Sequence, residues 1–382
     1  MPRPFEVPRP DLEAALLARL REGPPFLLAG PHGAGKTTLL RHAATALAAE
    51  GWTPVYLDLM GAASSPDRFV TAALEALPAG SFGALLPQAT EIRRLAAAGR
   101  EHGAEAVHAL FALWASLDAG SGRPVALLLD EATEIRSLAY FAGLREVHKP
   151  FLTALRARRR GTVLATSFPT LAGKHWPDLE VAIVGPLAAE DLRSTLRGAG
   201  VVADVAALVS ASGGWPRYLR VLTERLADGA DLETAWAAEM APGGRLDQAC
   251  RHTYETLLLR SRGYGIAKAA LAAVAEDEGA NLTALVSRLG RTPGATRDYL
   301  LWLVDVDALR VVRKRYYYVD TILRRWVRLY GQGRLPAAEG LRIAAAEAAR
   351  AAVPAEEPTP AAEAEPTPAP VLPRRDTLIE ID

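Results

Sequence analysis

Apolar residues follow one another along this chain in two patterns, which predict strands and helices respectively. Continuous apolar runs are typical of parallel strands covered on both faces, whereas an apolar residue at every third or fourth position is typical of a helix with one buried face. Helical spacing occurs at residues 12–20, at 64–122 and over much of the chain after residue 187. We predict five strands, at residues 26–29, 54–60, 125–129, 162–167 and 181–184. This alternation predicts an α/β fold with a five-stranded parallel sheet flanked by helices.

The first apolar run continues into a glycine-rich turn and a helix, in the sequence FLLAGPHGAGKTTLL. Residues 30–37 fit the P-loop pattern G-x-x-x-x-G-K-[ST], in which backbone N–H groups surround phosphate oxygens at the start of a helix. Lys36 is expected to reach the β- and γ-phosphates, and Thr37 to bind Mg²⁺. A chance glycine turn is the alternative, but the strand before the loop and the helix after it count against it. The predicted nucleotide-binding residues of the loop are Gly30, Pro31, His32, Gly33, Ala34, Gly35, Lys36, Thr37 and Thr38.

Two acids end the third apolar run, VALLLDEAT, at the edge where ligands of open α/β sheets collect. Asp130 is expected to hold Mg²⁺ together with Thr37. Glu131 is expected to polarise the attacking water as the general base. An acidic helix cap is the alternative. The pair predicts that the nucleotide is hydrolysed as well as bound.

Small hydroxyl residues follow the fourth run, and arginines precede it. Thr166 and Ser167 are placed where they could sense the γ-phosphate, and we count both among the catalytic candidates. The arginines end a helix predicted over residues 150–160, where basic side chains complement the helix dipole. The alternative is an arginine finger offered to a neighbouring subunit. The arginines concerned are Arg156, Arg158, Arg159 and Arg160.

The second half of the chain is helical and contains one predicted hairpin. Residues 212–219, SGGWPRYL, suit either a close approach of backbone to a ligand or an ordinary turn between helices. Residues 281–305 are predicted as helix, turn and helix, and residues 311–319 as a hairpin with a basic tip, which is the order of a winged helix-turn-helix. The second helix offers only Arg297 as a basic side chain for DNA, although a wing can hold phosphates. DNA binding and protein docking or autoinhibition both stay open.

Domain boundaries follow from these patterns. We expect an ATPase core at residues 1–187, a helical lid at 188–245 and a winged helix domain at 246–332. Residues 333–373 are rich in Ala, Pro and Glu, and are predicted to be mostly disordered. Apolar residues return at 374–382, as in a tethered docking peptide, although a tail tip without a role is the alternative.

Composition narrows the class of protein further. The 382 residues suffice for two or three domains, and a net charge of zero gives no general indication of nucleic-acid binding. The single cysteine excludes an internal disulfide and a cysteine-based metal site. No apolar run approaches the roughly 20 residues that span a bilayer, and the first residues lack the apolar core of a signal peptide. We therefore expect a cytoplasmic protein that does not bind membranes.

Together these motifs resemble those of the archaeal-type ATPases of the AAA+/STAND group, over about residues 5–330. The resemblance rests on GPHGAGKTT, LLLDEAT, LATS, SGGWPRYL, YLLWLVDVDALRVV and YYYVDTILRRWVRLY. It implies a sheet of order 5-1-4-3-2, ATP and Mg²⁺ as ligands, and Pro216 against the adenine. Relatives commonly have an arginine in the P-loop turn where this chain has His32. Many also have an arginine after the sensor strand, where this chain has Lys174 and His175. These differences imply slow turnover.

The function expected is an ATP-operated switch that hydrolyses ATP slowly. It would couple the nucleotide state to a protein partner through the winged helix or the C-terminal peptide. The alternative is a DNA-binding regulator or loader that uses the basic wing. Assembly into a homo-oligomer would suit either function.

Overall fold

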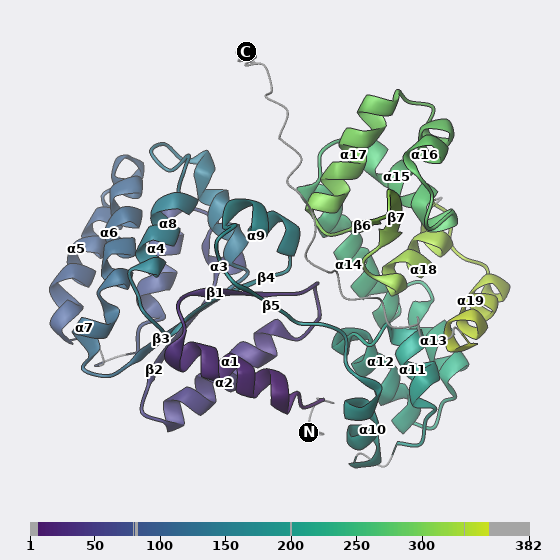
Figure 1. The fold of residues 1–382 in the computed structure, drawn as a ribbon, viewed down its shortest axis with the longest axis horizontal. Helices are drawn as coiled ribbons and strands as arrows, with labels where there is room; N and C mark the ends of the chain where they lie inside the picture. Colours follow the sequence, from purple (N-terminus) through teal and green to yellow (C-terminus); the bar gives the residue numbers. More distant parts are fainter. Residues whose placement is uncertain (1–6, 79, 81–82, 199–200, 332, 351–382) are drawn as a thin grey trace.

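A five-stranded parallel sheet forms the centre of the N-terminal half of the molecule (Figure 1). The computed structural model describes residues 7–78, 80, 83–198, 201–331 and 333–350. The strands run in the order β2-β3-β4-β1-β5, which confirms the α/β class and the predicted order. They are β1 (Phe26–Ala29), β2 (Thr53–Asp58), β3 (Val125–Asp130), β4 (Thr162–Thr166) and β5 (Val181–Ile183).

The second strand ends two residues earlier than predicted. Residues 59 and 60 belong to the short helix α3 (Leu59–Ala62), because the Asp58 carboxylate accepts a hydrogen bond from the Met60 N–H and caps this helix. The capping side chain thus ends β2 at the same edge of the sheet as the two acids of β3.

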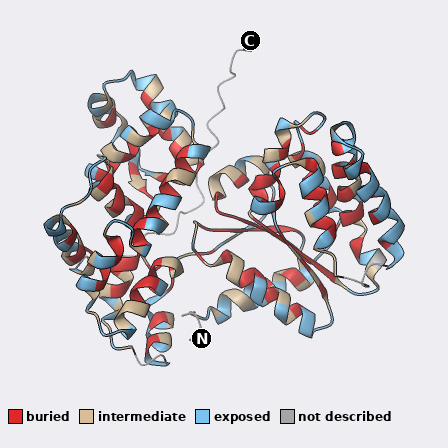
Figure 2. Ribbon diagram, turned by 180° about the vertical axis from the view of Figure 1, so that it is seen from behind, coloured by how far each residue is buried: buried red, intermediate tan, exposed pale blue. Residues whose placement is uncertain are grey.

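Helices cover both faces of the sheet, so that β1, β3 and β4 are buried along their whole length, whereas Val181 and Ile183 of the edge strand β5 are exposed (Figures 1 and 2). Leu28 and Leu128 belong to the apolar cluster that contains α1 and α2, and Leu27 and Leu127 to the cluster on the opposite face. The first face carries α1 (Pro10–Glu22) and α2 (Lys36–Ala49). The second carries α3, α4 (Pro66–Glu75), α5 (Leu86–Ala97), α6 (Gly103–Ala115), α7 (Leu117–Ser121), α8 (His148–Arg156) and α9 (Pro169–His175), with the 3₁₀ turns η1 (Gly83–Leu85), η2 (Arg100–His102) and η3 (Ala132–Tyr140).

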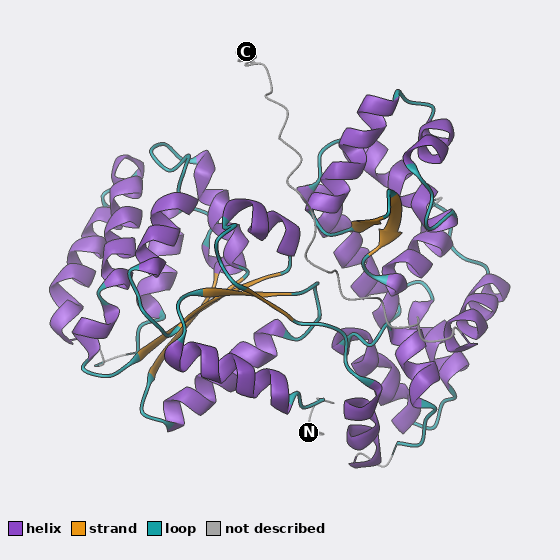
Figure 3. Ribbon diagram, in the orientation of Figure 1, coloured by secondary structure: helices purple, strands orange, loops and turns teal. Residues whose placement is uncertain are grey.

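The C-terminal half is helical apart from one antiparallel hairpin (Figure 3). The cluster on the α1 and α2 side continues into these helices, so the two halves share apolar packing. The predicted helix, turn, helix and hairpin are present as α16, α17, β6 and β7, and Arg313 and Lys314 form the turn of the hairpin with positive φ. The elements are α10 (Ala189–Gly198), α11 (Val205–Ser212), α12 (Pro216–Ala227), α13 (Leu232–Met240), α14 (Arg245–Arg260), α15 (Tyr264–Glu276), α16 (Leu282–Leu289), α17 (Pro293–Asp305), β6 (Leu309–Val312), β7 (Arg315–Tyr318), α18 (Thr321–Tyr330) and α19 (Ala338–Arg350).

The last helix corrects one sequence prediction. Residues 338–350 fall in the stretch expected to be mostly disordered, yet they form α19, which packs against α11 and α13. Leu341, Ala345 and Ala348 are its buried residues, and the two alanines let the helices approach closely. The rest of the predicted tail after residue 350, including the proposed docking peptide at 374–382, lies outside the described residues.

Within the described ranges, no helix is long and apolar enough to cross a bilayer. The same residues contain no group of three or more His, Cys, Asp or Glu side chains that could hold a metal ion. Cys250 is buried.

Candidate functional site

The glycine-rich turn joins β1 to α2 at the carboxyl edge of the sheet. Gly33 and Gly35 have φ of +80° and +97°, a region that residues with a Cβ avoid. A Cβ on Gly33 would lie 2.0 Å from Cδ of Arg217, so the turn also passes directly beneath this side chain from α12. Glycine is therefore required at residue 33 for two independent reasons.

A cleft of about 510 Å³ opens beside the turn, within the range usual for small-molecule sites. Arginines from several elements give its walls a positive character suited to an anionic ligand. Among the predicted residues, the lining includes His32, Gly33, Ala34, Gly35, Lys36, Thr37, Thr38, Glu131, Ser167 and Pro216. It also includes Val7, Arg9, Glu13, Leu39, Arg41, His42, Arg217 and Arg220.

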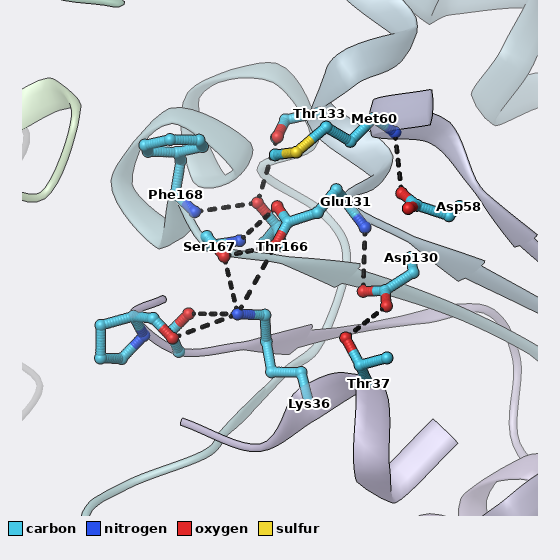
Figure 4. A network of polar contacts seen from close by, with 12 residues as sticks. Lys36, Thr37, Asp58, Met60, Asp130, Glu131, Thr133, Thr166, Ser167 and Phe168 are labelled. Carbon is cyan, nitrogen blue, oxygen red and sulfur yellow. Dashed lines mark hydrogen bonds and ion pairs between the residues drawn. The ribbon is translucent and has the colours of Figure 1, made fainter. Parts of the chain in front are cut away.

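Lys36 is folded back onto its own loop (Figure 4). Its Nζ donates to the carbonyl oxygens of Gly30 at 2.8 Å and Pro31 at 3.2 Å and to Ser167 Oγ at 2.8 Å, and lies 3.8 Å from Oε1 of Glu131. Burial lowers the pKa of Lys36, while Glu131 and Asp130 oppose the shift. The Lys36 ammonium group is therefore hydrogen-bonded to oxygens of the protein itself, at the place where the P-loop pattern predicts phosphate oxygens of a nucleotide.

Asp130 accepts hydrogen bonds from three donors, one on α2, one on β2 and one on the residue that follows it (Figure 4 shows two of them). Its Oδ2 accepts from Thr37 Oγ1 at 2.6 Å and from the Tyr56 hydroxyl at 2.9 Å, and its Oδ1 from the Glu131 N–H at 3.1 Å. The Thr37 hydroxyl and the Asp130 carboxylate are hard oxygen donors, which Mg²⁺ prefers, so these two residues fit the ion. Burial and the charge of Asp130 raise the pKa of Tyr56, so its phenol stays a donor.

Glu131 stands in a strained backbone conformation with φ of +47°. Its carboxylate accepts hydrogen bonds from the Ser167 N–H, at 3.0 Å, and from the Ser167 hydroxyl. Burial raises the pKa of Glu131, and the Lys36 charge works against that rise. Ser167 thus holds both the predicted lysine and the predicted base.

Thr166 lies behind the cleft, whereas His32 is part of its lining. The Thr166 hydroxyl is fully buried and pairs with Thr133 Oγ1 at 3.3 Å and with the Phe168 N–H at 3.0 Å, so it does not face the P-loop. The His32 ring packs edge-on against Phe168, and its Nε2 is buried without a hydrogen-bond partner. Burial, followed by the nearby Lys36 charge, lowers the pKa of His32 to about 3, which keeps the ring neutral.

The C-terminal half contacts the residues that follow Glu131 and Ser167. Arg260, at the end of α14, lies 4.8 Å from the Phe168 ring centroid and forms a 2.6 Å ion pair with the buried Glu134, without hydrogen-bond geometry. Asp307, two residues after the end of α17, accepts hydrogen bonds from the Thr170 N–H at 3.1 Å and the Thr170 hydroxyl at 2.5 Å. A second cavity, lined by His32, Ser167 and residues 306–308 among others, lies along this boundary.

The arginine cluster lies at the opposite edge of the sheet, before the start of β4. The Arg158 side chain is fully buried and donates to the carbonyl oxygens of Val125 at 2.7 Å and Trp114 at 3.3 Å. Arg156 pairs with Asp178 on the surface, and Arg160 lies over the Trp52 ring. Arg158 therefore stabilises its own core.

Several residues around the site escaped the sequence analysis. Tyr56 has no motif of its own, although it lies in a predicted strand. Arg217, which lines the cleft, belongs to the SGGWPRYL stretch that the analysis singled out. Asp307 and Arg260 reach the core only through packing between distant parts of the chain. No local signal in the sequence could have indicated those contacts.

Comparison with solved structures identifies the fold. The Walker-type ATPase paby2304 of Pyrococcus abyssi matches with a TM-score of 0.61 at 15% identity, over 85% of this chain and 97% of that chain. The ORC2 protein of Aeropyrum pernix, solved in ADPNP–ADP complexes, gives a TM-score of 0.46 at 15% identity, over 92% and 96% of the two chains. No family profile matches the sequence, and no curated protein is similar to it in sequence. The chain shares the fold of the Walker-type ATPase of Pyrococcus abyssi, in agreement with the α/β fold that the resemblance implied; at this identity the likeness concerns the fold alone.

Proposed function

We propose that this protein binds ATP and Mg²⁺ in the cleft beside the P-loop and hydrolyses the ATP slowly. The amide-lined turn with Lys36 would hold the phosphates, and Thr37 with Asp130 would hold Mg²⁺, which supplies positive charge to the β- and γ-phosphates. Glu131 would accept the proton of the attacking water. Pro216 lies 3.9 Å from where a Cβ on Gly35 would stand, which supports a place for it above the nucleotide.

Slow turnover is supported by the hydrogen bonds that Glu131 already makes. Both of its carboxylate oxygens accept from Ser167, so the base is engaged before any water reaches it. A γ-phosphate would compete for the Lys36 ammonium and the Ser167 hydroxyl, and only then would Glu131 lose a donor. We assign the sensing role to Ser167 rather than Thr166, whose hydroxyl points elsewhere.

The switch function rests on one observation: Ser167 and Thr170 lie three residues apart and contact different halves of the molecule. Ser167 holds Lys36 and Glu131, whereas Thr170 holds Asp307 of the proposed winged helix domain. A movement of Ser167 toward a phosphate would therefore shift the backbone that carries Thr170. We propose that ATP binding releases or repositions the winged helix. This movement would present the winged helix, or the C-terminal peptide, to a protein partner.

The test uses a donor and an acceptor dye on cysteines introduced at Tyr140 and Val311. Tyr140 is 94% exposed in the core and Val311 is 45% exposed in the wing, while the native Cys250 is buried. In a Glu131→Gln background, which should bind ATP without hydrolysing it, Mg·ATP should change the transfer efficiency and ADP should not. Identical efficiencies with ATP, ADP and no nucleotide would overturn the switch. Light scattering on the same samples reports any ATP-dependent homo-oligomer.

A DNA-binding regulator is the second candidate, supported by the wing. Arg313 and Lys314 at its tip are exposed, and no ion pair among the described residues involves either side chain. Such a wing would hold phosphates, so binding should weaken steeply with salt and on an Arg313→Ala change. Fluorescence anisotropy with duplex DNA at two salt concentrations measures both effects, and absence of binding at low salt would remove this candidate.

A further inference from the structure

Tyr56 lies behind the proposed metal site and touches it through one atom only. Its hydroxyl donates to Oδ2 of Asp130, the oxygen that also accepts from Thr37. Tyr56 is absent from the lining of the cleft. Asp130 also lies outside this lining, whereas Arg41, whose guanidinium lies over the Tyr56 ring, is part of it. The hydrogen bond to Asp130 is therefore the direct link between Tyr56 and the proposed metal site.

The register of the sheet explains how the tyrosine reaches the acid. Tyr56 on β2 is paired with Leu128 on β3, two residues before Asp130 and on the same face of the sheet. A tyrosine is long enough to reach the diagonal neighbour on the adjacent strand. Its ring packs against the apolar cluster on the α2 side of the sheet and lies under Arg41 of α2, 6.0 Å from the guanidinium carbon.

The three donors to Asp130 differ in what a metal would do to them. Thr37 would itself become a ligand, and the Glu131 N–H belongs to the residue that must change partners during hydrolysis. The Tyr56 hydroxyl is the donor that neither the metal nor the nucleotide is expected to recruit. Among the three, it is therefore the donor expected to keep its hydrogen bond to the carboxylate when the site is filled.

We propose that Tyr56 is a positioning residue that holds Asp130 in the orientation that binds Mg²⁺. The proposal rests on the proposed ATP and Mg²⁺ site and adds a separate claim. Tyr56 should affect the affinity for the metal and leave the affinity for metal-free nucleotide unchanged. Partners in the outer shell of metal sites typically change metal affinity by about 10–100-fold when they are removed.

The test is Tyr56→Phe, which removes the hydroxyl and keeps the ring. Binding of a fluorescent ATP analogue is measured first in EDTA and then during titration with Mg²⁺, and Mn²⁺ occupancy is followed by electron paramagnetic resonance. We expect the half-saturating Mg²⁺ and Mn²⁺ concentrations to rise about tenfold, with the affinity in EDTA within about twofold of wild type. Tyr330→Phe, which removes a hydroxyl bonded to the Met240 carbonyl far along the chain, should leave both unchanged.

A second variant separates positioning from packing. Tyr56→Leu removes the ring as well, and should show at least the metal defect of Tyr56→Phe. If Tyr56→Phe has the metal dependence of wild type and only Tyr56→Leu is impaired, the tyrosine merely packs and the proposal is wrong. If wild type itself binds nucleotide with no response to Mg²⁺, the proposed metal site fails, and this inference fails with it.

Discussion

Replacing Thr170 by valine removes the hydroxyl that the core offers to Asp307 and changes little else, because the two side chains have similar shapes. The hydroxyl lies 2.5 Å from Oδ1 of Asp307, and the Thr170 N–H remains as a second donor at 3.1 Å from Oδ2. Hydrogen bonds to charged groups contribute about 1.5–3 kcal/mol. Both residues are partly exposed, so we take the lower end of that range, about 1.5 kcal/mol, which corresponds to a roughly tenfold weaker docking of the winged helix onto the core.

The dye pair at Tyr140 and Val311 measures this docking. Thr170→Val should shift the nucleotide-free transfer efficiency toward the value that wild type reaches with Mg·ATP, and should reduce the further change on adding ATP. Thr153→Val is the matched control, because its hydroxyl bonds only to the Lys149 carbonyl within α8. An unchanged efficiency in Thr170→Val, at unchanged melting temperature, would show that this contact does not hold the winged helix.

Three further changes test other parts of the account. Burial raises the pKa of Asp307 from 3.8 to about 6 and outweighs the lowering by Thr170, so docking should weaken as the pH rises from 4 to 6, and Asp307→Asn should abolish this dependence of the dye signal. Gly33→Ala should lower the stability measured by urea unfolding and weaken ATP binding. Gly51→Ala is the control, because Gly51 has a similar positive φ but open space around an added Cβ. It should lower the stability by only about 1 kcal/mol and leave ATP binding intact. Arg158→Met should destabilise the fold by about 3 kcal/mol in urea and leave the nucleotide affinity normal. Arg159→Met, the control, should change neither the stability nor the affinity. Loss of turnover in Arg158→Met without loss of stability would support Arg158 as an arginine finger.

The parts of the fold that the sequence predicted are those with a local cause. Five apolar runs became five strands in the expected order. The pattern is plainest in β1, β3 and β4, because continuous burial on both faces leaves an uninterrupted apolar run within the strand. The meeting of Thr37 and Asp130, 93 residues apart, could be expected because both follow strands that end at one edge of a parallel sheet. The roles of these residues in binding and hydrolysis stay predictions.

The parts that escaped prediction depend on packing between distant segments. Tyr56 reaches Asp130 only because β2 and β3 pair in one particular register. Asp307 meets Thr170 across 137 residues through the docking of one half on the other. Helix α19 was missed because its buried face consists largely of alanine, which a search for large apolar residues passes over.

The central claim is that a triphosphate binds at the turn beside Asp130 and Glu131, and filter binding of γ-labelled ATP tests it most directly. With Mg²⁺ present, Glu131→Gln should retain one intact ATP per chain, wild type should release labelled phosphate slowly, and Lys36→Ala should retain none while keeping its melting temperature. Failure of both wild type and Glu131→Gln to retain ATP, or equal retention by Lys36→Ala, would contradict the account.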